Sequence, residues 1–134
     1  MRKVVLLFVD DDPAMHTFVG PALRRRAEGE IEIIDSYSPD EALAQLHDAP
    51  PGILVVLSDY DMGVAMTGVD MLRAIGDERP DAVRFLWSGH PAALLAREAE
   101  ASGVDRVFEK PVRIDELSRA VWSAARAFAE SETE

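Results

Sequence analysis

The sequence predicts an α/β fold built from five βα units, with one parallel sheet covered by helices on both faces. Short continuous apolar runs, typical of strands buried on both faces, alternate along the chain with segments of helical periodicity. Polar and acidic residues follow most of these runs directly. Because strands linked through helices run parallel and cross over right-handedly, the helices cover both faces of an open, doubly wound sheet.

The first βα unit begins with the apolar run Val4–Val9, which is predicted to be a buried strand. A helix is expected over Pro13–Arg26, with Asp12 as its N-cap and proline at the first helical position. The Gly20-Pro21 pair lies inside this segment. Proline removes a helical hydrogen bond, so we expect a kink here or an irregular first half.

The second and third units carry clearer capping signals. Ile31–Ile34 is the second predicted strand, and "SPDEALAQL" opens a helix with Ser38 as N-cap, Pro39 at the first position and Glu41 closing a capping box. "GILVVLSDYD" is the third strand, buried and ending in acids. "TGVDMLRAI" is the third helix, with Thr67 as its cap.

The last two units complete the domain. "AVRFLWSG" and "RVFEK" are the fourth and fifth strands. Helices are expected over Pro91–Ser102, closed by Gly103, and over the amphipathic segment Ile114–Ala129. We expect one domain over residues 1–128 and an acidic tail, ending in "ESETE", over residues 129–134.

Composition excludes several functions. The 134 residues are 48% hydrophobic and 29% charged, as in one globular domain, and no apolar run reaches the length of a membrane span. The N-terminal "MRKVVLLFVDDD" runs into acids where a signal peptide needs small residues. The net charge of −11 disfavours nucleic acids and anionic membranes as partners. There is no cysteine, so disulfides and thiolate metal sites are excluded, and we expect a cytoplasmic protein.

Chemically active side chains gather where the predicted strands end. In a parallel sheet these carboxyl ends meet at one edge, which is where ligands bind. The first, third, fourth and fifth strands end, respectively, in Asp10-Asp11-Asp12, Ser58-Asp59-Tyr60-Asp61, Ser88-Gly89-His90 and Glu109-Lys110-Pro111. Taken singly, these are ordinary capping, turn and surface residues. It is their joint placement that predicts a site.

Crowded carboxylates repel each other and raise each other's pKa unless a cation lies among them. Mg²⁺ prefers oxygen ligands and keeps part of its water, so two or three carboxylates from two strands suit it. With Mg²⁺ present, a carboxylate oxygen could attack a phosphoryl group. The Lys110 ammonium would then balance charge on its oxygens, and the Ser88 hydroxyl would bond another of them.

Four motifs in order, "LLFVDDDPAM", "ILVVLSDYDM", "FLWSGHP" and "VFEKPV", resemble the receiver domain of two-component response regulators over about residues 3–128. This resemblance implies the flavodoxin-like fold with strand order 2-1-3-4-5. It also implies a Mg²⁺-dependent phosphorelay, in which a sensor histidine kinase or phosphotransfer protein supplies the phosphoryl group. A conformational switch would then signal to a downstream protein target or an output domain outside this chain.

Site roles carry over from the family by motif. Asp59 is the expected phosphoacceptor, Ser88 the switch hydroxyl and Lys110 the amine that pairs with the phosphate. The resemblance also implies a cis peptide between Lys110 and Pro111, which aims the amine into the cleft. Under this assignment the chain is a signalling domain that catalyses only its own phosphorylation and dephosphorylation.

The metal site follows from the same resemblance. Asp11 is the expected direct Mg²⁺ ligand, Asp10 acts more through water, and Asp59 and the main-chain carbonyl of Asp61 complete the protein's share. The Asp61 side chain and His90 flank the expected path of the water that hydrolyses the phosphoryl group. Asp61 is a candidate general base for that water.

Three departures from the family pattern concern signalling. Gly63 stands where proline is usual, and the loop "GVAMTG" is about one residue longer than the common form, which predicts more mobility beside Asp59. Val107 replaces the usual aromatic rotor. The neighbouring Phe108 should point to the opposite face of the sheet, because side chains alternate along a strand.

Two other functions remain open. "DYDMG" partly matches the nucleophile and acid/base motif of haloacid-dehalogenase-like phosphatases, with Asp59 and Asp61 in those roles. Those enzymes place the motif on the first strand, whereas here it follows the third. A receiver that no longer accepts phosphate and serves only as a protein-docking module is the other alternative.

Overall fold

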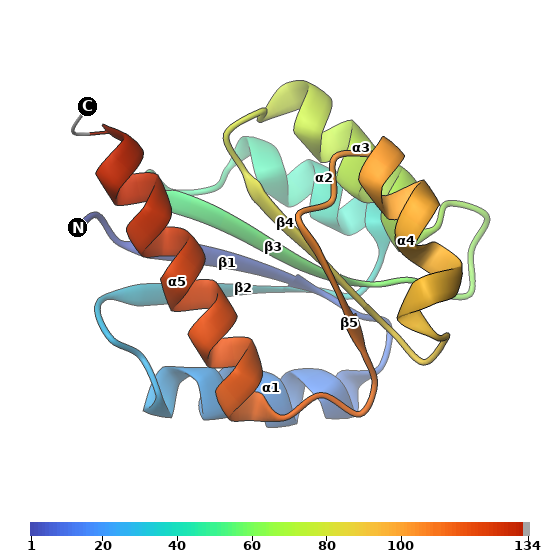
Figure 1. Cartoon of the computed structure of the whole chain (residues 1–134), viewed down its shortest axis with the longest axis horizontal. Helices are drawn as coiled ribbons and strands as arrows, with labels where there is room; N and C mark the ends of the chain where they lie inside the picture. The colour runs from blue at the N-terminus through green and yellow to red at the C-terminus, as the bar shows by residue number, and fades with distance from the viewer. Residues whose placement is uncertain (133–134) are drawn as a thin grey trace.

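The computed structural model describes residues 1–132, which form one five-stranded parallel sheet in the order β2-β1-β3-β4-β5 (Figure 1). This confirms the predicted flavodoxin-like fold and its strand order. The strands are β1 (Val4–Val9), β2 (Ile31–Ser36), β3 (Ile53–Asp59), β4 (Val83–Ser88) and β5 (Arg106–Glu109). The helices are α1 (Pro13–Arg25), α2 (Pro39–His47), α3 (Gly68–Glu78), α4 (Ala92–Ala101) and α5 (Ile114–Glu132).

Alternation along the strands divides the core into two layers. On β1, Val4, Leu6 and Phe8 pack with α1 and α5, whereas the intervening residues of the same strand pack with α2, α3 and α4. All six residues of β1 are buried, as the continuous apolar run predicts for a central strand covered on both faces. Figure 1 shows α1 and α5 on one side of the sheet and the other three helices opposite.

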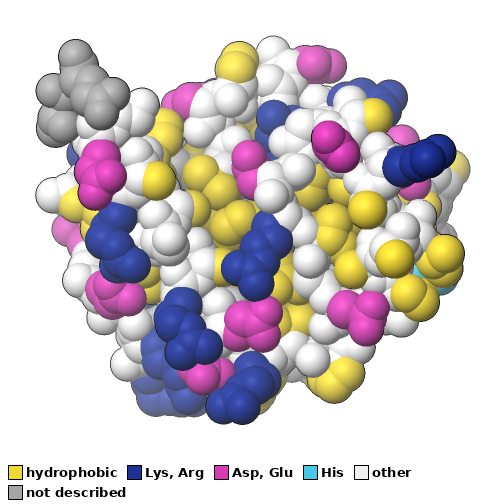
Figure 2. Space-filling view, viewed as in Figure 1, with side chains coloured by type: hydrophobic (Ala, Val, Ile, Leu, Met, Phe, Trp, Pro, Cys, Tyr) yellow, Lys and Arg dark blue, Asp and Glu magenta, His cyan; other side chains and the backbone are white. Residues whose placement is uncertain are grey.

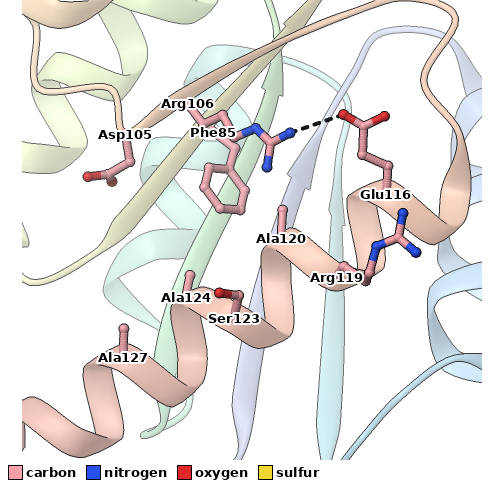
Figure 3. Close-up of a pocket in the computed structure, with 9 residues that line it drawn as sticks. All are labelled: Phe85, Asp105, Arg106, Glu116, Arg119, Ala120, Ser123, Ala124 and Ala127. Carbon is pink, nitrogen blue, oxygen red and sulfur yellow. Dashed lines mark hydrogen bonds and ion pairs between the residues drawn. The ribbon is translucent and has the colours of Figure 1, made fainter.

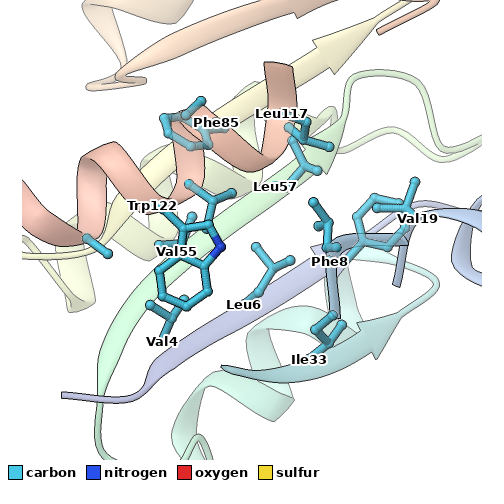
Figure 4. Packing of buried hydrophobic residues seen from close by; sticks show 14 of the residues in the cluster. Val4, Leu6, Phe8, Val19, Ile33, Val55, Leu57, Phe85, Leu117 and Trp122 are labelled. Atoms are coloured by element: carbon cyan, nitrogen blue, oxygen red, sulfur yellow. The ribbon is translucent and has the colours of Figure 1, made fainter. Parts of the chain in front are cut away.

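The layer beneath α5 is filled by large side chains from distant parts of the chain. Trp122, which is 1% exposed, lies over the first half of the sheet, near Val4, Leu6 and Val55 (Figure 4). A buried aromatic of this size removes a large apolar area from water and fixes the helix against the strands. The loops that follow β1, β3 and β4 lie at the opposite end of the sheet.

The predicted N-caps are present, with one difference. Asp12 accepts a hydrogen bond from the Ala14 N–H at 3.0 Å and caps α1. Thr67 and Asp70 form a complete capping box at α3, where only the Thr67 cap was predicted. At α2, Ser38 accepts from the Glu41 N–H, but the Glu41 carboxylate accepts from the Gln45 amide, so the predicted box is formed only by half.

Helix α1 corrects the expectation of an irregular first half. Its first half is regular, and the helix runs continuously to Arg25 with Pro21 inside it. An interior proline costs about 3 kcal/mol in an isolated helix. Here the burial of Val19 and Leu23 against the sheet holds the helical conformation on either side of the proline.

Helix α5 corrects the predicted end of the last helix. It extends to Glu132, three residues beyond the predicted end at Ala129, and takes in part of the predicted tail. Arg2 from the N-terminus forms an ion pair with Glu132 and lies over the Phe128 ring, 5.4 Å from its centroid. These contacts with the N-terminus stabilise the final turn. Thr133 and Glu134 of the predicted tail lie outside the described residues.

The remaining element boundaries differ from the predictions by at most three residues; β2 continues to Ser36, and α3 continues to Glu78, beyond the predicted end at Ile75. Such shifts are expected, because helix and strand ends depend on hydrogen bonds that propensity does not determine. Within residues 1–132 no helix has both the length and the apolar character needed to cross a membrane.

Candidate functional site

Three acidic side chains meet where strands β1 and β3 end. Asp10 and Asp11 follow β1, and Asp59 is the last residue of β3. One carboxylate oxygen from each lies within 4.8 Å of the other two. The parallel β1–β3 pairing sets Val9 opposite Ser58, so the residues that follow reach the same edge of the sheet. The predicted acidic cluster is therefore present as a geometric group.

Asp59 is held firmly at the centre of the cluster. Its side chain accepts hydrogen bonds at Oδ1 from the Tyr60 N–H at 2.9 Å and from the Lys110 ammonium at 3.2 Å. Asp59 is only 8% exposed. Burial raises the pKa of Asp59, and the nearby Asp10 carboxylate raises it further, while Lys110 opposes both effects. A cation close to Asp59 would relieve this cost.

Lys110 brings a positive charge to the acids. The Lys110–Pro111 peptide bond is cis, as the motif implied. The Lys110 Nζ lies 3.2 Å from Asp59 Oδ1 and 3.6 Å from Asp10 Oδ2. It also lies 4.7 Å from the centroid of the Trp87 ring. The ammonium thus sits between two carboxylates, where it can balance added negative charge.

Asp10 supplies the observation that tests whether the cluster suits a metal ion. Asp10 is 1% exposed, and its Oδ1 accepts from the Asp12 N–H at 2.9 Å. Its Oδ2 is buried and has no hydrogen-bond partner among residues 1–132. Buried carboxylate oxygens normally accept hydrogen bonds, so an oxygen that faces two further acids and has only the Lys110 ammonium nearby, at 3.6 Å, fits a hard cation such as Mg²⁺. The residues present therefore fit the metal that the sequence predicted.

Ser88 and His90 lie on the loop that follows β4. The Ser88 side chain is 1% exposed, and its Oγ accepts a hydrogen bond from the His90 N–H at 3.0 Å. Accepting this bond leaves the hydroxyl proton free to donate elsewhere. The predicted switch hydroxyl is therefore held by its own loop, close to the carboxyl ends of β3 and β5.

The side chains of Asp61 and His90 meet outside the acidic cluster. His90 Nε2 lies 3.1 Å from Asp61 Oδ2, and both side chains are at least half exposed. The His90 ring also packs edge-on against Tyr60, with 5.5 Å between ring centroids. Tyr60 in turn contacts Glu98 at 3.5 Å, and burial together with Glu98 raises the pKa of the Tyr60 hydroxyl. These contacts join the loops after β3 and β4 beside the site.

Comparison with known proteins decides the family. The family model described as the response regulator receiver domain matches residues 6–122, most of the chain. The chain belongs to this family. Receiver domains are signalling domains of two-component systems, and the acidic cluster, Ser88 and Lys110 all lie within the matched residues.

Relatives with established names are regulators. The receiver is 32% identical over 128 residues to the hydrogenase transcriptional regulatory protein HoxA of Cupriavidus necator, covering 94% of this chain and 25% of HoxA. It is 26% identical to the photosynthetic apparatus regulatory protein RegA of Rhodobacter capsulatus, covering 91% of this chain and 63% of RegA. The chain thus spans a quarter of one relative and less than two thirds of the other.

A solved structure agrees with the fold. The crystal structure of a response regulator receiver domain protein from Clostridium thermocellum is 25% identical, with a TM-score of 0.82, and the match covers 92% of this chain and 95% of that one. The five-stranded order and the five helices of this receiver are those of its structural relatives.

Sequence reasoning missed two residues that shape the receiver site. Gly68, the first residue of α3, lies so close to Asp59 that an added Cβ would be 1.9 Å from the Asp59 carbonyl oxygen. Ser58 Oγ donates to that same carbonyl at 2.8 Å. The "TG" before the third helix was the available signal for Gly68, but close approach to another strand cannot be read from local sequence.

The departures from the family pattern have structural counterparts in this receiver. Gly63 adopts a positive φ of 71°, a conformation that proline cannot reach. Val107 packs with the layer of α2, α3 and α4, and Phe108 is buried in the layer of α1 and α5. The predicted opposite orientation of these two side chains is confirmed.

Two hollows flank β5 away from the acidic cluster. One, of about 490 Å³, lies between β5 and α5, where Arg106 and Glu116 form an ion pair across it (Figure 3). The other, of about 450 Å³, lies between β5 and α4. Figure 2 shows this face of the receiver, where acidic and basic side chains are interspersed and hydrophobic side chains lie exposed between them. Neither hollow is lined by a member of the acidic cluster.

Proposed function

We propose that this receiver accepts a phosphoryl group onto Asp59 from a phosphohistidine of a sensor histidine kinase or phosphotransfer protein. The observation that carries the proposal is the position of Asp59, between the Lys110 ammonium at 3.2 Å and the carboxylates of Asp10 and Asp11. This combination places a buried nucleophile beside both a cation and a candidate metal site.

The transfer is a displacement at phosphorus. Both hydrogen bonds given to the Asp59 side chain within residues 1–132 go to Oδ1, so Oδ2 keeps its lone pairs for attack. A new O–P bond forms at Asp59 while the P–N bond of the donor breaks. The electron pair of that bond stays on the histidine nitrogen.

Mg²⁺ would be held by the carboxylates of Asp10, Asp11 and Asp59 and by the main-chain carbonyl of Asp61. When bound, it supplies positive charge that offsets the negative charge of the incoming phosphoryl oxygens. Asp10 Oδ2 is buried and accepts no hydrogen bond within residues 1–132, and its one ion-pair contact there is Lys110 at 3.6 Å, which supports this assignment.

Lys110 and Ser88 would complete the phosphoryl site. The Lys110 ammonium already lies within bonding distance of Asp59 and needs little movement to pair with a phosphoryl oxygen. Ser88 would donate its hydroxyl proton to another oxygen. If Ser88 moved toward the phosphoryl group, its bond with the His90 N–H would be strained, and the loop would follow.

Helix α4 is the first element that this movement would reach. Pro91 gives α4 no side-chain cap, and the Ala92 N–H donates instead to the Glu109 carboxylate at 2.8 Å. Glu109 directly precedes Lys110 and pairs with Ser88 across the strands. With Val107 in place of an aromatic rotor, this contact offers a short route from the site to α4.

Protein partners suit the surface better than nucleic acids. The net charge of −11 disfavours phosphate backbones, so we assign no nucleic-acid or membrane contact to this domain. The cytoplasm is its proposed location. An apolar hollow of about 380 Å³ beside Lys110, lined by Met15 and Phe18 among others, supports contact with a phosphodonor protein. The output would lie in a downstream protein or in a domain outside residues 1–128.

The test is intact-mass analysis after incubation with acetyl phosphate and Mg²⁺. We expect one added phosphoryl group on the native chain and none on Asp59→Asn. Asp81→Asn, which changes an exposed aspartate outside the site, is the matched control and should label normally. Unlabelled native protein would favour a docking module, and sustained hydrolysis of phosphate esters would favour the phosphatase assignment with Asp61 as acid/base.

A further inference from the structure

His16 of α1 is a buried polar residue to which the phosphoryl chemistry above assigns no role. It is 6% exposed and lies between two aromatic rings, with its centroid 4.5 Å from that of Phe8 and 4.2 Å from that of Tyr37. Both ring nitrogens are engaged. Nε2 lies 2.7 Å from the Asp10 carbonyl oxygen, and Nδ1 lies 2.7 Å from Asp35 Oδ1.

The two partners hold the ring from opposite sides. A carbonyl oxygen can only accept, so His16 Nε2 donates to Asp10. Nδ1 is paired with the Asp35 carboxylate at 2.7 Å. The Asp35 carboxylate lies on β2 and fixes the ring, and the ring in turn holds the main chain at the end of β1.

Asp10 is consequently held from several sides. Its N–H donates to the Ser36 carbonyl at 3.1 Å, its carbonyl accepts from His16, and its side-chain Oδ1 accepts from the Asp12 N–H. With these three groups occupied, only the side-chain Oδ2 is left without a hydrogen bond, and it lies 3.6 Å from the Lys110 ammonium. Of these three bonds, only the one from His16 joins Asp10 to another residue's side chain. The other two partners are main-chain groups, Asp12 in the β1–α1 turn and Ser36 in the β1–β2 ladder.

We propose that His16, oriented by Asp35, is a positioning residue that sets the main chain at Asp10 and so prepares the acidic cluster for Mg²⁺. This inference depends on the proposed function in one respect, because it takes Mg²⁺ as the ion that the acidic cluster binds. Groups that orient a metal ligand without touching the metal typically change metal affinity by about 10-fold or more. His16 acts through the backbone of Asp10, and we expect an effect near the lower end of that range.

The experiment measures Mg²⁺ binding to the unphosphorylated chain by calorimetry, well below the unfolding temperature. His16→Phe keeps an aromatic ring between Phe8 and Tyr37 but removes both hydrogen bonds, so Mg²⁺ affinity should fall about 10-fold. His16→Gln restores one donor toward Asp10 and should recover part of the loss. Tyr37→Leu, which disturbs the same packing without removing either bond, should bind Mg²⁺ as the native chain does.

Asp35→Ala provides a second route, because it frees the ring while leaving His16 in place. It should weaken Mg²⁺ binding in the same direction as His16→Phe. Native affinity in His16→Phe, or in Asp35→Ala if the former does not fold, would overturn the proposal. So would equal losses in His16→Phe and Tyr37→Leu. A native chain that binds no Mg²⁺ would instead contradict the metal site of the proposed function, and the role of His16 would be rejected with it.

Discussion

At the scale of single residues, Asp59 carries a cost that the fold does not relieve by itself. Its carboxylate is buried beside Asp10, and these two effects raise its pKa more than Lys110 lowers it. A nucleophile kept in a crowded acidic cluster is therefore poised for a ligand that brings positive charge. The same cost makes the acceptor measurable through stability.

Asp59→Asn should stabilise the metal-free chain at neutral pH. The pKa of Asp59 is higher in the folded state than in the unfolded state, so ionisation favours unfolding, and stability is lost as pH rises through that interval. The variant removes this loss. Thermal unfolding should give a higher Tm for the variant at pH 7, with the difference shrinking below about pH 4, where the unfolded aspartate is also protonated. A variant less stable than the native chain at pH 7 would contradict the direction of the shift.

Asp61 is predicted to shorten the life of the phosphoryl group. Its exposed side chain lies 3.1 Å from His90, beside the mouth of the site, where it can take a proton from an attacking water. Asp61→Asn should slow loss of the phosphoryl group, followed by intact mass after removal of the donor, by at least a few-fold. The decay rate in His90→Asn shows whether the Asp61–His90 pair is needed or whether Asp61 acts alone. If the phosphoryl group decays in Asp61→Asn at the native rate or faster, the Asp61 side chain takes no part in its hydrolysis. Asp61 would then act only through its main-chain carbonyl, as a proposed metal ligand.

At the scale of elements, the start of α3 is joined closely to the end of β3. The Gly68 N–H donates to the Tyr60 carbonyl at 2.8 Å, and Gly68 has no side chain to separate the helix from Asp59. The capping box of Thr67 and Asp70 fixes the helix at the same point. The helix start thus depends on contact with another strand as much as on its own capping residues.

Gly68→Ala should be strongly destabilising. The added Cβ would lie 1.9 Å from the Asp59 carbonyl oxygen, a backbone atom that cannot move aside cheaply. We expect a loss of about 2–4 kcal/mol in the free energy of unfolding, measured by chemical denaturation. Gly89→Ala is the matched control, because nothing lies within 4 Å of its added Cβ, and it should change stability by less than about 0.5 kcal/mol. Equal effects of both substitutions would mean that close packing at Gly68 is not what matters.

At the scale of the whole molecule, the buried acidic residues of the described chain lie at one edge of the sheet. The net charge of −11 is spread over the surface, but the buried acids Asp10 and Asp59 gather at the carboxyl ends of β1 and β3. Lys110, which directly follows β5, is a cation that the fold brings to them. A divalent ion there would stabilise the folded state, because the unfolded chain has no such cluster.

Mg²⁺ should raise the Tm of the native chain. At ten times its dissociation constant it would add about 1.4 kcal/mol, or roughly 5 °C for a domain of this size. Differential scanning fluorimetry with increasing MgCl₂, at ionic strength held constant with NaCl, measures the effect. Asp11→Asn should remove most of it, since Asp11 is the exposed carboxylate of the cluster and has little structural part. A Tm that does not respond to millimolar Mg²⁺ would contradict the metal site.

The sequence alone determined the fold and the composition of the site. Continuous apolar runs identify buried parallel strands, and Ser38 and Thr67 mark helix starts, because these signals act over a few residues. The order of acids, Ser88 and Lys110 at strand ends predicted which side chains share an edge, because parallel strands align their carboxyl ends. Side-chain chemistry suggested a Mg²⁺ and phosphoryl site, and the family resemblance assigned the individual roles, such as Asp59 as the acceptor.

Tertiary structure decided what depends on residues distant in the sequence. Helix α1 stays regular through Pro21 because its neighbours are buried, and α5 reaches Glu132 because Arg2 contacts its end. The contact of His16 with Asp10, held by Asp35 from another strand, has no local signature. Local patterns report propensity and periodicity, whereas these features come from hydrogen bonds and packing that exist only once the strands lie side by side.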